Sequence, residues 1–309
     1  MKSSIYGDPV PPKKDRRDQA REKARLQLAA AQKRERRVRW AWRGGIGLGL
    51  IAIVAVIAIV IVGGARPAGA GPLNMASDGI VLTGDGTTVT AVTTPALAAD
   101  ATPVATDPTA SPDTVNIVTY IDYLCPFCGQ FEATNAAQIT SWLTAGNATL
   151  EVHPISILDA SSKGTKYSTR AANAAACVAN YDPNNFLAVN TALFTQQPKE
   201  NTEGLTNAQL TTLVKDAGAT DPKIATCITD GTFSAWVATA TDRALSGPLP
   251  NANIPKVNGT PTVIVNGVAY TGALDDATAF QTFVTQQAAA ASAGSTATPT
   301  PTPAPTPTP

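Results

Sequence analysis

The chain has 309 residues, enough for one or two domains, and its formal net charge is zero. That balance hides an asymmetry, because residues 1–43 hold 14 Lys/Arg against 5 Asp/Glu, while the rest of the chain holds 9 against 18. A basic tail of this kind either contacts anionic lipid head groups or serves only as a topology signal in a solvated segment. No nucleic-acid-binding motif accompanies it, so we expect no nucleic acid partner.

Residues 44–65 carry no charge and are mostly aliphatic. A helix needs about 20 such residues to cross a bilayer. The positive-inside rule then places the basic tail in the cytoplasm and everything after Arg66 outside. A cleaved signal peptide ending at residues 68–70 (Ala-Gly-Ala) is the alternative, but its leading region would be unusually long. We therefore expect a single-pass anchor in the cell membrane, with the remaining chain in an extracytoplasmic compartment where disulfides persist.

Residues 66–113 are rich in Ala, Thr, Gly, Pro and Asp and hold few large apolar side chains, which predicts a flexible spacer. Two β-prone runs within it, 80–83 and 88–92, flank the turn-forming residues 84–87. This pattern favours a small β-hairpin, which would pair with an edge of the folded domain.

Residues 114–291 are expected to form one globular domain of ordinary size. The pattern predicts a strand, a helix, a second strand, a long helical block, two strands joined by an Asn-Gly turn, and a last helix. Within the helical block, Thr206 is expected to be an N-cap. Residues 292–309 soon become a Thr-Pro repeat, which predicts an extended, disordered tail. The main elements are expected at 115–121, 128–145, 150–153, 167–245, 262–265 and 268–271.

Two cysteines, Cys125 and Cys128, stand at the corner between the first strand of this domain and its helix. A residue just ahead of a helix meets unbonded N–H groups and the positive end of the helix dipole, so the pKa of the Cys125 thiol should be lowered. Pro126 suits the first helical turn, because it has no N–H to satisfy. We expect a redox-active pair in which Cys125 is the exposed nucleophile and Cys128 is the buried resolving thiol.

The domain resembles the DsbA-like thioredoxin-fold family, and most closely the membrane-anchored members found in actinobacterial envelopes. The resemblance covers residues 114–291 and implies an α/β, thioredoxin-like fold with an inserted helical block, here preceded by a single transmembrane helix. It is carried by the long helical block and by two motifs, Cys125-Pro126-Phe127-Cys128 and Gly259-Thr260-Pro261-Thr262.

The resemblance also implies roles for Thr260 and Pro261. Pro261 would be a cis-proline opposite the active-site sulfurs, and Thr260 would offer its backbone to an extended substrate chain. A trans-proline that opens a strand is the alternative. Phe127 stands where strongly oxidising members carry His, so we expect a less oxidising potential. Thr260 before the proline is more typical of isomerase and reductase members.

Cys177 and Cys227 lie 50 residues apart in the helical block. The simplest interpretation is a structural disulfide that joins two helices and, in the chain-entropy model, favours the folded state by roughly 4 kcal/mol. A second redox relay and two unpaired thiols are the alternatives.

Three other ionisable residues are candidates for a role. His153 is the only histidine, and zinc needs about four ligands, so we expect no metal or cofactor and place His153 on a strand near the sheet edge. Asp122 either tunes the site or is a solvated loop acid. Glu132, one turn after Cys128, either accepts a proton from that thiol or lies on a solvated helix face.

Together these features indicate a membrane-anchored, extracytoplasmic thiol–disulfide oxidoreductase that exchanges disulfides with secreted or envelope proteins through Cys125 and Cys128. The resemblance implies reoxidation by a membrane partner of the DsbB type or the vitamin K epoxide reductase type. Two alternatives remain: a dedicated reductase or isomerase of specific envelope thiols, and a non-catalytic thioredoxin-like binding module.

Overall fold

The computed structural model describes residues 69–108 and 114–295 of the chain. The basic tail at 1–43 and the membrane span expected at 44–65 lie outside these residues, as does most of the Thr-Pro tail. Within the two described ranges, no helix is both long and apolar enough to cross a membrane.

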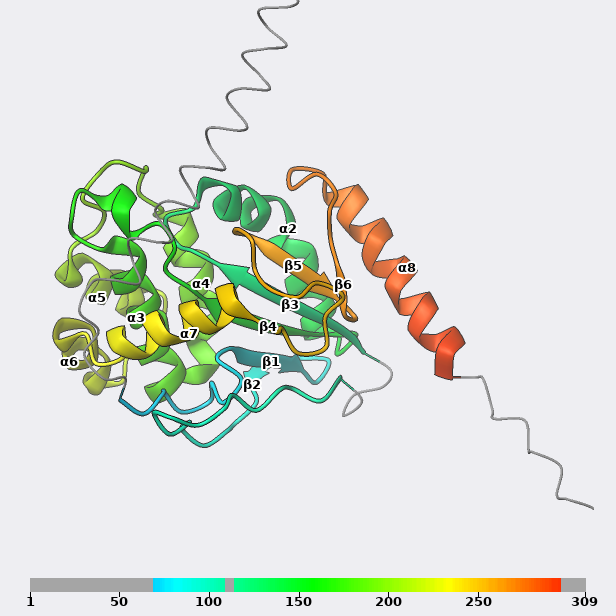
Figure 1. Cartoon of the computed structure of the whole chain (residues 1–309), viewed down its shortest axis with the longest axis horizontal. Helices are drawn as coiled ribbons and strands as arrows, with labels where there is room; N and C mark the ends of the chain where they lie inside the picture. Colours follow the sequence, from blue (N-terminus) through cyan, green and yellow to red (C-terminus); the bar gives the residue numbers. More distant parts are fainter. Residues whose placement is uncertain (1–68, 109–113, 296–309) are drawn as a thin grey trace, which may run out of the picture. The chain divides into compact units, whose positions relative to one another are not determined.

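A mixed sheet of six strands lies at the centre of the described fold (Figure 1). The strands are β1 (Ile80–Gly84), β2 (Val89–Ala91), β3 (Val115–Ile121), β4 (Ala148–Pro154), β5 (Thr262–Val265) and β6 (Val268–Ala269). They are arranged in the order β2-β1-β4-β3-β5-β6. The central pair, β3 and β4, runs parallel, and β5 lies antiparallel to β3. The central strands and the turn between β5 and β6 therefore match the order predicted from the sequence.

The hairpin of β1 and β2 extends this sheet beyond β4. β1 pairs antiparallel with β4, with Ile80 opposite Val152, which confirms the expected pairing with the domain edge. The expectation of a flexible spacer is wrong for the described part of 66–113. Met75, Leu82 and Leu97 of this segment are buried in the core, although Leu73, Val92 and Val104 are exposed. Asp78 also forms two 2.6 Å hydrogen bonds with the Arg243 guanidinium.

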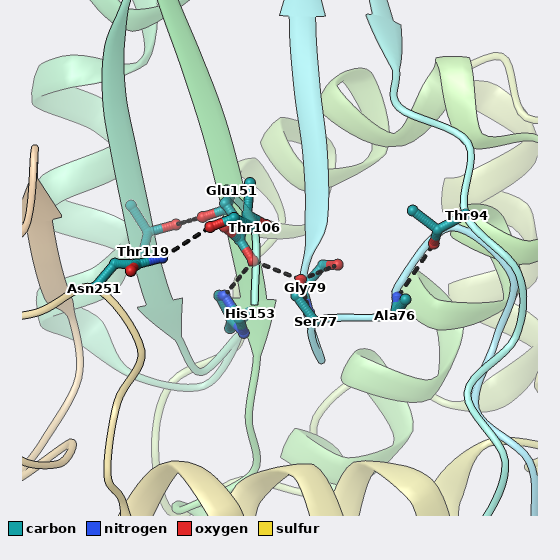
Figure 2. Close-up of polar contacts among 9 residues, drawn as sticks. All are labelled: Ala76, Ser77, Gly79, Thr94, Thr106, Thr119, Glu151, His153 and Asn251. Atoms are coloured by element: carbon teal, nitrogen blue, oxygen red, sulfur yellow. Dashed lines mark hydrogen bonds and ion pairs between the residues drawn. The ribbon is translucent and has the colours of Figure 1, made fainter. Parts of the chain in front are cut away.

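Buried polar contacts hold the segments around this hairpin on the sheet (Figure 2). The Ser77 hydroxyl donates to the carboxylate of Glu151 on β4 at 2.5 Å, and His153 Nε2 lies 3.0 Å from the same carboxylate. The His153 ring stacks on Tyr120, with ring centroids 4.3 Å apart. Because β1 covers β4, His153 is buried on an interior strand, and the expected position near the sheet edge is wrong.

Helices cover both faces of the sheet. Their bounds, with two short 3₁₀ helices, are α2 (Pro126–Thr144), η2 (Asp159–Ser162), α3 (Tyr167–Tyr181), η3 (Pro183–Asn185), α4 (Phe186–Thr195), α5 (Asn207–Asp216), α6 (Pro222–Asp230), α7 (Ser234–Ser246) and α8 (Ala277–Ser295). Phe131 of α2 meets Phe280 of α8 on one face, with ring centroids 5.1 Å apart. On the other face, Ala244 of α7 packs in a cluster with Tyr120 of β3. α8 continues to residue 295, so the tail expected to be disordered from residue 292 begins as helix.

In the helical block between β4 and β5, α3, α5 and α6 gather beside the sheet, whereas α7 runs across one of its faces (Figure 1). Thr206 caps α5, and its hydroxyl accepts the Gln209 N–H in a capping box, as predicted. A disulfide joins Cys177 of α3 to Cys227 of α6, and both residues are buried. This is the pairing that the sequence favoured, and it ties together two helices of the inserted block.

Candidate active site around Cys125 and Cys128

Helix α2 begins after the short loop that follows β3. Cys125 is its N-cap residue and has an extended backbone (φ −72°, ψ 117°). The Cys125 carbonyl accepts hydrogen bonds from the N–H groups of Cys128 at 3.0 Å and Gly129 at 3.1 Å, which start the helix. Pro126 occupies the first turn, where a missing N–H costs nothing. Cys125 therefore lies at the positive end of the helix, which favours a thiolate.

The two thiols are free and differ in acidity. The pKa of Cys125 is lowered to about 7, mainly by the hydrogen bond from the Cys128 thiol. Burial opposes this shift, and the backbone N–H groups of Cys128 and Phe127 add to it. Burial, followed by the interaction with Cys125, raises the pKa of Cys128 well above its ordinary range. Cys125 is only 4% exposed, so the expected exposure of the nucleophile is wrong, whereas the neighbouring Phe127 is 59% exposed. Solvent access to Cys125 is therefore restricted, and Cys125 is next in sequence but one to an exposed aromatic ring.

The loop before β5 forms the opposite wall of the site. The Thr260–Pro261 peptide bond is cis, so the trans alternative is wrong. The Cys125 thiol donates a hydrogen bond to the Thr260 carbonyl, with 3.2 Å between sulfur and oxygen. This contact joins residues 135 positions apart and places the loop directly over the nucleophile.

Gln197, which follows α4 in the helical block, also belongs to the site. Its Nε2 group donates to the carbonyl of Cys125 at 2.8 Å and to that of Tyr123 at 3.1 Å. A Cβ atom at position 129 would lie 2.3 Å from Gln197 Oε1, so Gly129 leaves the room that this side chain needs. Gln197 was not predicted, because no local pattern marks a residue so far along the chain from the Cys motif.

Asp122 is fully buried, and the alternative of a solvated loop acid is wrong. Its carboxylate accepts four hydrogen bonds, with lengths of 2.7–2.9 Å, from the N–H groups of Leu124, Ile157 and Leu158 and from the Ser168 hydroxyl. Burial raises its pKa to about 6, although those hydrogen bonds act in the opposite direction. Asp122 thus fixes the loop that carries Cys125 to the segment after β4 and to α3.

The carboxylate of Glu132 faces α4. It accepts hydrogen bonds from Asn190 Nδ2 at 3.2 Å and from the Thr191 hydroxyl at 3.1 Å. Burial raises its pKa, so the alternative of a freely solvated helix face is wrong. Glu132 and Cys128 lie one helical turn apart and line the same small cavity.

A family model described as thioredoxin matches residues 107–286, which is more than half of the chain. The chain belongs to the thioredoxin family, in its DsbA-like branch. The reduced DsbA of Mycobacterium tuberculosis is 26% identical, with a TM-score of 0.50, and the match covers 71% of this chain and all of that one. This DsbA-like protein is therefore a thiol–disulfide oxidoreductase.

Two further similarities are more limited. MdbA of Corynebacterium diphtheriae, a thiol–disulfide oxidoreductase, has a TM-score of 0.50 at 18% identity, over 72% of this chain and 95% of that one, which shows a shared fold. The serine/threonine-protein kinase PknE of M. tuberculosis is 32% identical over 157 residues, or 50% of this chain. The matched region spans only 26% of the kinase's own length.

In this DsbA-like protein, the fold brings four of the residues singled out in the sequence to one place: Cys125, Cys128, Thr260 and Pro261. The Cys177–Cys227 disulfide lies in the helical block instead. Across residues 69–108 and 114–295, no group of three or more His, Cys, Asp or Glu side chains is arranged to hold a metal ion.

Proposed function

We propose that the chain exchanges disulfides with secreted or envelope proteins through Cys125 and Cys128, and that it does so outside the cytoplasm from a membrane anchor at residues 44–65. The observation that carries this proposal is the difference between the two thiols: the pKa of Cys125 is lowered to about 7, and that of Cys128 is raised. The anchor and the extracytoplasmic location rest on the sequence, where the basic tail at 1–43 precedes the apolar stretch.

The chemistry follows from this difference. A substrate thiolate attacks the Cys125 sulfur of the oxidised pair, and Cys128 leaves and takes up a proton. The second substrate thiolate then attacks the substrate sulfur of the mixed disulfide, and Cys125 leaves as a thiolate. A thiol with a low pKa is the better leaving group, so the Cys125 pKa speeds this second step. Two electrons are left on the dithiol, and a membrane partner of the DsbB or vitamin K epoxide reductase type would accept them.

The proline loop would hold the substrate during this exchange. In the reduced protein, the Thr260 carbonyl accepts its hydrogen bond from the Cys125 thiol. In the oxidised pair and in the mixed disulfide Cys125 has no S–H to donate, so the carbonyl is available to a backbone N–H of an extended substrate. Thr260 and Pro261 thereby favour substrate chains that pass directly over the bound sulfur.

The test uses the full-length chain in an insulin-reduction assay, alongside Cys125→Ser and Cys128→Ser. We expect Cys125→Ser to be inactive and Cys128→Ser to accumulate mixed disulfides on Cys125, because the resolving thiol is missing. When Cys128→Ser is instead expressed in cells, mass spectrometry of the chains trapped on Cys125 identifies clients and partner together. Activity retained in Cys125→Ser would rule out the proposed function.

A dedicated reductase or isomerase is the second candidate, and Phe127 favours it. Phe127 puts an exposed, uncharged ring where a positive side chain would further stabilise the thiolate. The reduction potential separates the candidates: about −120 mV is typical of DsbA, and about −270 mV of thioredoxin. A value far below about −300 mV would instead indicate a static bridge in a non-catalytic binding module.

A further inference from the structure

A cavity of about 360 Å³ lies between α7 and the sheet, on the opposite face of the sheet from α2. Tyr120 of β3 and His153 of β4 line it from the sheet, and α7 contributes a second wall. Side chains within residues 102–105, before β3, and the loop at residues 247–250, after α7, complete the lining. Pockets for small molecules usually have volumes of about 300–1,000 Å³, so this space suits a small organic ligand.

Hydrogen bonds hold the walls of this cavity in place. In the segment before β3, the Val104 N–H donates to the carbonyl of Ala76 at 2.8 Å. Two residues later, the Thr106 carbonyl accepts from Asn251 Nδ2 at 2.8 Å, which joins this segment to the loop after α7 (Figure 2). A ligand would therefore enter a cavity that is already formed, and its binding would not have to order the walls.

The lining is mainly apolar, and its charges are paired. Its apolar part includes Pro103, Ile155, Pro248 and Leu249. Among the described lining residues, the charged side chains are Asp78 and Arg243, which pair with each other through two hydrogen bonds of 2.6 Å. His153 is also engaged, since its Nε2 atom lies 3.0 Å from the Glu151 carboxylate. A charged ligand would therefore find no free group of opposite charge.

The hydroxyl of Tyr120 is the polar group that remains available in this cavity. Tyr120 is only 5% exposed, and no group among the described residues forms a hydrogen bond with its hydroxyl. Buried tyrosine hydroxyls usually have a partner. Burial first, and then the charges of Glu151 and Asp78, raise the pKa of Tyr120 above its ordinary range, so the hydroxyl stays protonated and can donate.

We propose that this cavity binds a small, uncharged organic molecule with an apolar body and one oxygen that accepts a hydrogen bond from Tyr120. A ketone has this chemistry, because its carbonyl satisfies the hydroxyl and introduces no charge. A carboxylate would have to compete with Asp78 for Arg243, and an ammonium group would have to compete with Arg243 for Asp78. Either charge would otherwise be buried without a partner, which is costly.

This site is separate from the cysteine pair. Neither Cys125 nor Cys128 lines the cavity, and α2 packs on the other face of the sheet. The proposed binding therefore goes beyond disulfide exchange and does not depend on it.

The test follows the methyl groups of the cavity in NMR spectra of the full-length chain, labelled at its alanine and isoleucine methyls. Ile155 and Ala244 line the cavity, so they report binding there directly. The probes share a phenyl ring and differ in the attached group: acetophenone, ethylbenzene, benzoate and benzylammonium. We expect acetophenone to shift both methyls in a saturable manner, and the two charged probes to bind roughly tenfold more weakly or worse.

Tyr120→Phe removes the hydroxyl and keeps the ring that stacks on His153. The dissociation constant of acetophenone should rise about fivefold, the typical effect of losing one neutral hydrogen bond. That of ethylbenzene, which has no oxygen, should not change. Tyr181→Phe, on α3 and away from the cavity, is the matched control and should bind acetophenone as the wild type does.

Two neighbouring positions give an independent comparison, which also carries the test if Tyr120→Phe does not fold. Ala105 and Val104 are both exposed, but only Ala105 lines this cavity. Ala105→Trp should abolish the methyl shifts, and Val104→Trp should leave them unchanged. The proposal is overturned if the wild type shows no saturable binding of acetophenone, or if it binds benzoate more tightly than acetophenone. Equal acetophenone binding by Tyr120→Phe and the wild type, or by the two tryptophan variants, would overturn it as well.

Discussion

Replacing Cys128 by alanine tests why Cys125 ionises readily. The hydrogen bond from the Cys128 thiol is the largest cause that lowers the pKa of Cys125 from 9.0 to about 7. At about 1.4 kcal/mol per pH unit, this difference favours the thiolate by roughly 3 kcal/mol. In Cys128→Ala the donor is lost and burial still opposes ionisation. We therefore expect the pKa of Cys125 to rise to about 9.

The assay is the rate of Cys125 alkylation by iodoacetamide as a function of pH, because only the thiolate reacts. At pH 7 a pKa of about 9 leaves roughly one hundredth of the residue ionised, compared with about half in the wild type, so alkylation should slow by roughly fiftyfold. Cys128→Ser is the matched control. It keeps a hydroxyl donor, so the pKa of Cys125 should stay well below that of the alanine variant.

A Cys125 pKa that remains near 7 in Cys128→Ala would refute this reasoning. The shift would then belong to the smaller contributions, which come from the Thr260 side chain and from the backbone N–H groups of Cys128 and Phe127 at the start of α2. Equal pKa values in the serine and alanine variants, both near 9, would show that a hydroxyl cannot replace the thiol donor.

Three further predictions concern the surrounding structure. Cys177→Ala should lower stability by about 4 kcal/mol and Tm by roughly 8–16 °C, and the double variant with Cys227→Ala should add little, because one substitution already opens the loop; additive losses in calorimetry would contradict a shared bridge. Gln197→Ala removes the hydrogen bonds to the carbonyls of Cys125 and Tyr123. It should lower the free energy of unfolding by about 1–3 kcal/mol and slow disulfide exchange. Exchange at the wild-type rate would show that Gln197 contributes only packing. Because the pKa of Cys125 is lower in the folded chain, its thiolate contributes stability that is full above about pH 9 and is lost as pH falls through about 7; denaturant unfolding of the reduced chain, with Cys125→Ser as reference, measures this dependence.

The elements near the Cys motif could be predicted because local chemistry specifies them. Pro126 and the strand before it define the start of α2, Thr206 carries its own capping box, and Asn266-Gly267 turns β5 into β6. Each of these signals lies within a few residues of the element that it controls. The strand and helix order therefore follows from the sequence over most of the domain.

The partners of Asp122, Gln197 and His153 could not be predicted in the same way. The Asp122 carboxylate accepts hydrogen bonds from N–H groups more than 30 residues further along the sequence. Gln197 is 72 residues from Cys125 in the sequence and donates to its carbonyl. His153 is interior only because β1 pairs with its strand. Environments assembled from distant segments leave no local pattern, which is why the alternatives for these side chains stayed open.

The hairpin of β1 and β2 has a consequence for how the protein can be shortened. The thioredoxin family match begins at residue 107, after this hairpin. A fragment that begins there loses the partner of β4 and presents a free row of backbone donors and acceptors, a template for edge-to-edge aggregation. The fragment also lacks Ser77 and Asp78. Glu151 therefore loses its hydrogen bond from Ser77, and Arg243 loses its ion pair with Asp78. A fragment that is to stay soluble therefore has to start before residue 75, which is earlier than the boundary that family similarity alone suggests.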